Sequence, residues 1–171
     1  MIKQALNRIL IIGDSGRGKT VLARKISEKL GIPAYSTDDY LYEMKFTVYK
    51  DRQKGINEIT NIYQNNKWIV EGTTHYLLKP GLDLADVIIY LKYDNIFYQW
   101  LTIIKRFLKR KDKSFLRMIW LIWHVLYKRL QTKNSRLKKG QMTTSERIDP
   151  YKHKVITLNS FKEIDDFIDT I

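Results

Sequence analysis

The sequence predicts an α/β fold in which helices flank a parallel sheet, and three observations predict it. Short apolar runs alternate with segments whose apolar residues recur at helical spacing. The first apolar run leads into a glycine-rich GxxxxGK[ST] pattern at residues 13–20. The length of 171 residues suits one domain, so we expect residues 1–171 to form a single unit.

The strands and helices are read in order along the chain. Residues 8–12 are expected to form a strand buried on both faces, because Arg8 is followed by four consecutive apolar residues. Leu22, Ile26 and Leu30 recur four residues apart as one helix face, and Gly31 and Pro33 end that helix. Further strands are expected at 34–36, 68–70, 87–91 and 154–158, and further helices at 52–65, 96–111, 114–132 and 161–171.

Composition excludes several classes of protein. The chain has no cysteine, which excludes disulfide scaffolds, thiolate metal sites and thiol nucleophiles and suits a reducing cytoplasm, where we expect the protein. The apolar run 9–12 is too short for a secretory signal. The longest apolar stretch, 118–127, falls short of the roughly 20 residues of a spanning helix, so no membrane span is predicted.

The formal net charge of +13 is concentrated in one segment. Residues 105–139 hold thirteen Lys and Arg against one acid, which gives +12, and the rest of the chain gives +1. Such a segment is either a solvated basic face or a surface for polyanions. The polyanion would be a nucleotide's phosphates, a nucleic acid or lipid headgroups.

The pattern at residues 13–20 has the chemistry of a phosphate-binding loop. Glycines let successive backbone N–H groups point at phosphate oxygens, and the helix that follows adds its positive N-terminus. In such a loop the lysine, here Lys19, reaches the β- and γ-phosphates, and the hydroxyl of Thr20 coordinates Mg²⁺. The predicted nucleotide-binding residues are Gly13, Ser15, Gly16, Arg17, Gly18, Lys19 and Thr20.

The order of motifs resembles the adenylate kinase-type branch of P-loop kinases, and within it the adenylate kinase-like topology modulation protein family. The resemblance lies in the phosphate-binding loop, in residues 68–76 and 85–91, and in the closing segment 155–164. It implies a P-loop NTPase fold with five parallel strands in the order 2-3-1-4-5. It also implies a basic, helical, lid-like insertion at 96–139, with ATP and Mg²⁺ as the cofactors.

Acids follow the second and third predicted strands. In an open parallel sheet, ligands lie outside these carboxyl ends. Asp38 resembles the base of uridine kinase-like enzymes, and the alternative is that it caps a short helix. For Asp39 the structural role is the favoured one. Glu71 resembles the acid of an acid–Gly pair that orders Mg²⁺ waters, and either Asp38 or Glu71 could be the Walker B-type group.

The basic segment supplies the predicted arginines of the site. Arg106 and Arg110 are four apart, so one helix face would carry both. The resemblance implies that Arg106 stacks on adenine and that Arg110 neutralises the transferring phosphoryl group. Arg129 and Arg136 are weaker candidates for the far side of the lid. His75, beside the Glu71 strand, is more typical of a structural or surface histidine.

The stretch 114–130 is apolar on nearly all sides. One predicted face would hold Phe115, Ile119, Ile122, Leu126 and Leu130, with Trp120, Trp123 and Tyr127 largely outside it. The interpretations are an enlarged lid packed on the core, a homodimer contact, or docking on a membrane surface or nucleic acid.

Together these features predict an ATP-dependent phosphotransferase, a small-molecule kinase that transfers the γ-phosphate of ATP to a nucleoside, nucleotide or similar small acceptor. Lys19, Asp38 and Arg110 would be its catalytic residues, and Thr20 and Glu71 would hold the metal. The alternative is an NTP-binding, nucleic-acid-associated module with little kinase activity. No motif identifies the acceptor, whose pocket is expected within residues 40–66.

Overall fold

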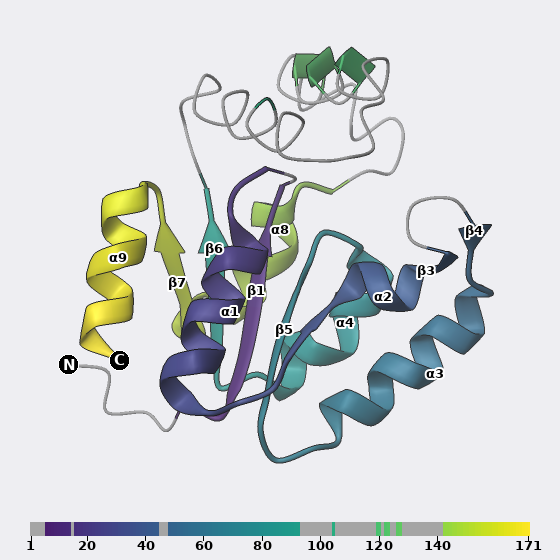
Figure 1. The fold of residues 1–171 in the computed structure, drawn as a ribbon, viewed down its shortest axis with the longest axis horizontal. Coiled ribbons are helices and arrows are strands. Elements are labelled where there is room, and N and C mark those ends of the chain that lie inside the picture. The colour runs from purple at the N-terminus through teal and green to yellow at the C-terminus, as the bar shows by residue number, and fades with distance from the viewer. Residues whose placement is uncertain are drawn as a thin grey trace.

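A five-stranded parallel sheet forms the centre of the fold, with helices on both faces (Figure 1). The computed structural model describes residues 6–14, 16–44, 48–92 and 142–171, together with residues 104, 119–120, 122–123 and 126–127. Most of the predicted lid at 96–139 therefore lies outside the described residues.

The strand order agrees with the expectation from the sequence. Hydrogen-bonded neighbours follow the order β2-β5-β1-β6-β7, and every pairing in this sheet is parallel. Numbered along the chain, these five strands have the order 2-3-1-4-5, so the predicted topology is confirmed. The strands are β1 (Arg8–Gly13), β2 (Ala34–Ser36), β5 (Trp68–Gly72), β6 (Val87–Leu91) and β7 (Val155–Leu158).

Each face of the sheet has its own core, because side chains alternate along a strand. Ile9 and Ile11 of β1 pack with α1 (Lys19–Leu30) and α9 (Phe161–Thr170). Leu10 and Ile12 point the other way and pack with α3 (Arg52–Tyr63) and α4 (His75–Leu84). Figure 1 shows the two layers of helices on opposite sides of the sheet. The central strand is fully enclosed, which explains its unbroken apolar run.

Element boundaries differ from the sequence expectation by one or two residues. β5 continues to Gly72, two residues beyond the predicted strand, and α3 ends at Tyr63. β7 begins at Val155 because Lys154 still belongs to a 3₁₀ helix, η1 (Asp149–Lys154).

Several elements were not predicted. α4 was missed because Pro80 and Gly81 interrupt its pattern, although Pro80 lies inside the helix. A β-carbon at Gly81 would lie 2.5 Å from the Tyr63 ring, so the glycine lets α3 and α4 approach. The Tyr63 hydroxyl in turn donates to the Leu77 carbonyl at 3.0 Å. The other unpredicted elements are α2 (Thr37–Leu41), the hairpin of β3 (Tyr42–Met44) and β4 (Val48–Tyr49), and α8 (Thr144–Ile148).

Candidate active site

The glycine-rich loop joins the end of β1 to the start of α1. Gly16 and Gly18 have φ angles of 82°, a left-handed conformation that residues with a β-carbon adopt at a cost. Gly18 is the N-cap of α1, and no side chain caps the helix there. The backbone N–H groups of the first turn are therefore left for a ligand, as a phosphate-binding loop requires.

Both cations of the loop point inward. Lys19 is 8% exposed, and its Nζ donates to the Asp14 carbonyl oxygen at 3.1 Å. Arg17 is also buried, and its guanidinium forms an ion pair with the Asp14 carboxylate at 3.1 Å. Of the predicted loop residues, Ser15 lies outside the described residues.

A hydrogen bond links the loop to the neighbouring strand. The Thr20 hydroxyl donates to Oε1 of Glu71 at 2.8 Å. Glu71 is 5% exposed and lies beside Ile11 in the pairing of β1 with β5, which places its carboxylate at the start of α1. The sequence left open whether Asp38 or Glu71 is the Walker B-type group. The structure shows that the loop hydroxyl is hydrogen-bonded to Glu71.

The donor set fits Mg²⁺. A hydroxyl and a carboxylate are the hard oxygen ligands that Mg²⁺ prefers, and this ion usually takes its other ligands from waters and substrate phosphates. Within the described ranges, no cluster of three or more His, Cys, Asp or Glu side chains could hold a metal ion. Among the described residues, Thr20 and Glu71 would hold the ion together with phosphate oxygens and waters.

Asp38 lies near this site but is not the helix cap. The N-cap of α2 is Ser36, whose hydroxyl accepts from the Asp38 backbone N–H at 3.4 Å. Asp38 sits in the first turn and is half-buried, whereas Asp39 is exposed. Ser36 pairs with Glu71 between β2 and β5, so Asp38 emerges at the same edge of the sheet.

Gly72 allows α2 to pack against the end of β5. A β-carbon at this position would lie 1.9 Å from Oγ1 and 2.6 Å from Cγ2 of Thr37. Thr37 is fully buried, so it has little room to retreat. The glycine after the acid is therefore required by space, and it holds Glu71 and Asp38 in one cluster.

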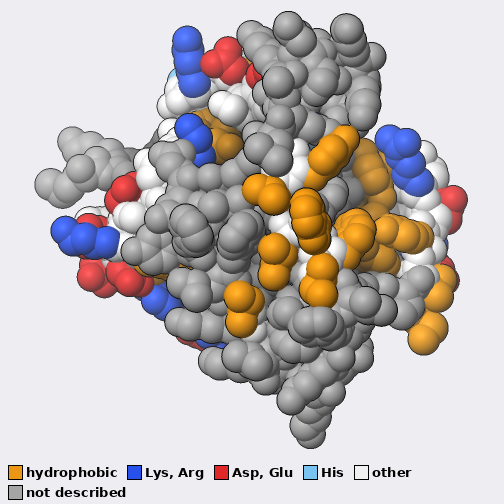
Figure 2. Space-filling model, turned by 90° about the horizontal axis from the view of Figure 1, so that it is seen from above, with side chains coloured by type: hydrophobic (Ala, Val, Ile, Leu, Met, Phe, Trp, Pro, Cys, Tyr) orange, Lys and Arg blue, Asp and Glu red, His pale blue; other side chains and the backbone are white. Residues whose placement is uncertain are grey.

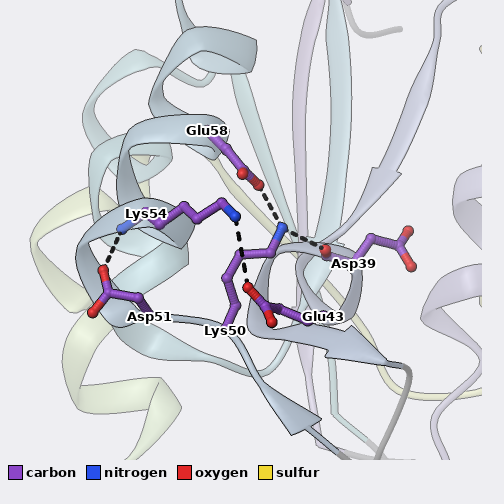
Figure 3. A network of polar contacts seen from close by, with 6 residues as sticks. All are labelled: Asp39, Glu43, Lys50, Asp51, Lys54 and Glu58. Carbon is purple, nitrogen blue, oxygen red and sulfur yellow. Dashed lines mark hydrogen bonds and ion pairs between the residues drawn. The ribbon is translucent and has the colours of Figure 1, made fainter.

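Three cations lie at the start of α3 or just before it, and they differ in their partners. Lys50 Nζ forms an ion pair with the Glu58 carboxylate at 2.5 Å and donates a hydrogen bond to the Asp39 carbonyl (Figure 3). Lys54 Nζ lies 3.6 Å from the Glu43 carboxylate. Arg52, between the two lysines, is exposed and has no carboxylate partner among the described residues. Its guanidinium carbon lies 4.6 Å from the centroid of the Tyr76 ring, in the first turn of α4.

Arg52 is a candidate that sequence reasoning missed. It lies in the region 40–66 where the acceptor pocket was expected, but no pattern separates it from the neighbouring lysines. The only available signal is the surplus of cations over acids in the stretch 50–54. What distinguishes Arg52 is its contact with α4, which was not predicted.

The start of α4 is electropositive. Burial lowers the pKa of His75 below its usual value, and the positive charges of Arg147 and Lys79 lower it further. Both effects favour the neutral form of the imidazole. The cations that act on it would favour an anionic group bound near this helix N-terminus.

Arg106, Arg110, Arg129 and Arg136 lie outside the described residues, as does most of the proposed homodimer stretch 114–130. In the part that is described, Ile119, Ile122 and Leu126 are half-buried and helical. The side chains outside that face are exposed, at 62% for Trp120, 65% for Trp123 and 54% for Tyr127.

Figure 2 shows hydrophobic side chains gathered on the face of the molecule seen from above, beyond the carboxyl ends of the sheet strands. In the described part of the chain, no helix is both long enough and apolar enough to cross a membrane.

Comparison with known proteins agrees with this architecture. An adenylate kinase of Pseudarthrobacter chlorophenolicus is 33% identical over 82 residues, which are 48% of this chain and 41% of that enzyme. The match thus spans less than half of the length of either protein. No family model matches the chain.

Solved structures with the same fold cover nearly the whole chain. A gluconokinase of Sinorhizobium meliloti aligns with a TM-score of 0.56 at 11% identity, over 98% of this chain and 90% of its own. A shikimate kinase of Bacteroides thetaiotaomicron aligns with a TM-score of 0.54 at 15% identity, over 97% of this chain and 96% of its own. A shikimate kinase of Acinetobacter baumannii, solved with shikimate, aligns with a TM-score of 0.53 at 17% identity, over 98% of this chain and 91% of its own. The chain thus has the fold of these solved small-molecule kinases, and about half of it is similar in sequence to part of an adenylate kinase.

Proposed function

We propose that the protein transfers the γ-phosphoryl group of ATP to the hydroxyl of a small acceptor that also carries an anionic group. The observation that carries this proposal is the 2.8 Å hydrogen bond between Thr20 and Glu71 at the mouth of the phosphate-binding loop. It places the loop hydroxyl beside a buried carboxylate, and a loop hydroxyl and an acid are the groups that hold Mg²⁺ in P-loop NTPases.

Lys19 and Thr20 of the loop have direct parts in the proposed reaction. Lys19 binds the β- and γ-phosphates after its Nζ turns from the Asp14 carbonyl, a contact of 3.1 Å that keeps it within the loop. Thr20 and Glu71 hold the Mg²⁺ ion, Glu71 either directly or through a water. When bound, Mg²⁺ neutralises charge that develops on the phosphate oxygens. Arg110 would add charge stabilisation from the lid.

Asp38 is the proposed general base. Ser36 already caps α2, so the half-buried Asp38 carboxylate is not needed for that task. Its position two residues beyond the Ser36–Glu71 pair supports a role at the shared edge of the sheet, where an acceptor would meet the phosphate. There it would accept the proton of the attacking hydroxyl.

Arg52 is the proposed anchor for the acceptor's anionic group. Lys50 and Lys54 already pair with carboxylates, whereas Arg52 presents its guanidinium beside Tyr76 without such a pair in the described structure. A planar guanidinium can donate two parallel hydrogen bonds to a carboxylate or phosphate. The neighbouring α4 N-terminus would favour the same charge.

ADP release with ATP and Mg²⁺, measured against a panel of acceptors, tests the proposal. The panel pairs neutral hydroxyl compounds (nucleosides and sugars) with anionic ones (nucleoside monophosphates, sugar phosphates and hydroxy acids such as shikimate). We expect turnover with an anionic member and little with its neutral counterpart. Equal turnover of both would remove the anionic requirement, and no stimulated ADP release with any acceptor would contradict the kinase proposal.

Two single substitutions separate the proposed acceptor site from a general charge effect. Arg52→Ala should raise the KM for the anionic acceptor about 10-fold or more, while the KM for ATP stays unchanged. Lys54→Ala is the matched control. It also removes one positive charge, but Lys54 lies two residues from Arg52 and its side chain is paired with Glu43. If both variants change the acceptor KM equally, Arg52 has no specific role.

A further inference from the structure

The phosphate-binding loop contains an ion pair of its own. The Arg17 guanidinium lies 3.1 Å from the Asp14 carboxylate, with Arg17 buried at 7% side-chain exposure and Asp14 at 42%. Lys19 donates to the backbone carbonyl of the same Asp14. Asp14 therefore interacts with both cations of the loop, with one through its side chain and with the other through its backbone.

An acid in this loop opposes the loop's own ligand. Asp14 directly follows Gly13, the first residue of the pattern that would surround the phosphates. A carboxylate there repels a polyphosphate, and the repulsion is weakly screened because the site is partly buried. Arg17 offsets the charge within the same short loop. The pair has no net charge, but each member alone would change the potential at the phosphates.

We propose that the Asp14–Arg17 pair sets the affinity of the loop for polyphosphate, with Arg17 cancelling the repulsion from Asp14. This inference rests on the proposed nucleotide-binding function. Asp14 lowers the affinity below what Lys19, Arg17 and the backbone N–H groups would give without it, which favours release of the diphosphate product. Arg17 keeps the same carboxylate from preventing binding. Both act as positioning and charge-setting residues and take no part in the chemical step.

A purely structural pair would behave differently. If the ion pair only held the loop in shape, loss of either partner would weaken nucleotide binding, because a distorted loop binds worse. If the pair sets the charge, the two single variants have opposite signs. Loss of the acid leaves an extra buried cation and tightens binding, whereas loss of the cation exposes the acid and weakens it.

Calorimetric titration with ATP, ADP and AMP measures these signs. The variants are Asp14→Asn, Arg17→Met and the double variant, because Asn and Met keep most of the side-chain volume. We expect Asp14→Asn to bind ATP about 10-fold tighter, Arg17→Met about 10-fold weaker, and the double variant to return close to the original affinity. The effects should be smaller for ADP and smallest for AMP, since they follow the ligand's charge.

Arg24 and Glu28 provide the control pair. They are 3.9 Å apart on α1 and both are about two-thirds exposed. Arg24→Met and Glu28→Gln change the net charge by the same amounts as the loop variants, but at a solvent-screened position. Neither should change ATP affinity measurably. Changes equal to those of the loop variants would show a general charge effect and overturn the proposal.

The outcomes separate the two proposals. If the unmodified protein binds neither ATP nor ADP, the proposed function fails and the inference fails with it. If it binds them but Asp14→Asn binds no tighter, the inference alone is wrong. Asp14→Asn decides the question even if Arg17→Met does not fold, because it alters a half-exposed side chain and leaves the buried arginine in place.

Discussion

Gly72→Ala should destabilise the protein through a single clash at the candidate site. The added β-carbon would lie 1.9 Å from Thr37 Oγ1, whereas an ordinary contact needs about 3.4 Å, so α2 and β5 must separate by about 1.5 Å. Thr37 is fully buried and β-branched, so it cannot rotate away. We expect the free energy of unfolding to fall by about 3 kcal/mol, at the upper end of the usual overpacking range.

A second substitution should recover part of this loss. Thr37→Ala removes Oγ1 and Cγ2, the two nearest atoms, and leaves its own β-carbon 2.7 Å from the new methyl group. On its own it should be nearly neutral, because the Thr37 hydroxyl is buried without a hydrogen-bond partner in the described structure. The double variant should therefore recover at least half of the stability that Gly72→Ala loses.

Urea denaturation of the unmodified protein, both single variants and the double variant measures the coupling. Gly31→Ala is the control for backbone strain, since a β-carbon there meets nothing within 4 Å but φ is +65°. We expect it to cost about 1 kcal/mol from conformation alone. A Gly72→Ala variant within about 0.5 kcal/mol of the original protein would refute the reasoning, as would a double variant no more stable than Gly72→Ala.

Four further predictions concern the site and the core. Lys19→Ala should abolish most ATP affinity in calorimetry while the circular dichroism spectrum is kept; unchanged affinity would remove Lys19 from the site. Asp38→Asn should lower kcat about 10²-fold with ATP binding little changed, and full activity would show that no base is needed there. Arg110→Ala should lower kcat about 10³-fold, and an effect no larger than that of a neighbouring lysine would contradict its role at the transferring phosphate. Burial raises the pKa of Tyr63 above its usual value, so the folded state favours the neutral phenol; the resulting stability is present below about pH 10 and is lost as the pH rises further. Tyr63→Phe removes the hydrogen bond to Leu77, so the free energy of unfolding at pH 7 should fall by about 1 kcal/mol. Denaturation curves at rising pH should show that this variant loses less stability above about pH 10 than the original protein. An equal loss of stability at high pH would exclude Tyr63 as the cause of that loss.

The sheet and the nucleotide side of the site were predictable because their signals are local. A strand enclosed by two cores must be apolar at every position, and Ile9 to Ile12 meet that rule without a break. The loop after it needs glycines at its left-handed positions, so its sequence is nearly fixed by its geometry. Both rules act over a few consecutive residues, which a single sequence displays.

The proposed acceptor side could not be predicted because the residues proposed for it are distinguished by contacts between distant segments. Pro80 and Gly81 read as helix breakers, although Gly81 is there to admit the Tyr63 ring. Arg52 differs from Lys50 only in what surrounds it. Likewise, Glu71 could be chosen over Asp38 as the partner of the loop hydroxyl only once the two strands were paired. The lid arginines are still untested predictions.

The placement of the two cores on opposite faces of the sheet has a consequence for how this chain could change its substrate. The helix after the phosphate-binding loop packs in one core, while α3 and α4, which carry Arg52 and Tyr76, pack in the other. Substitutions that reshape the acceptor side would therefore disturb packing that the nucleotide loop does not share. Under the proposed function, variation in acceptor choice could accumulate on one layer while the nucleotide-binding layer stays unchanged, so this architecture would separate what is phosphorylated from how the phosphate is supplied.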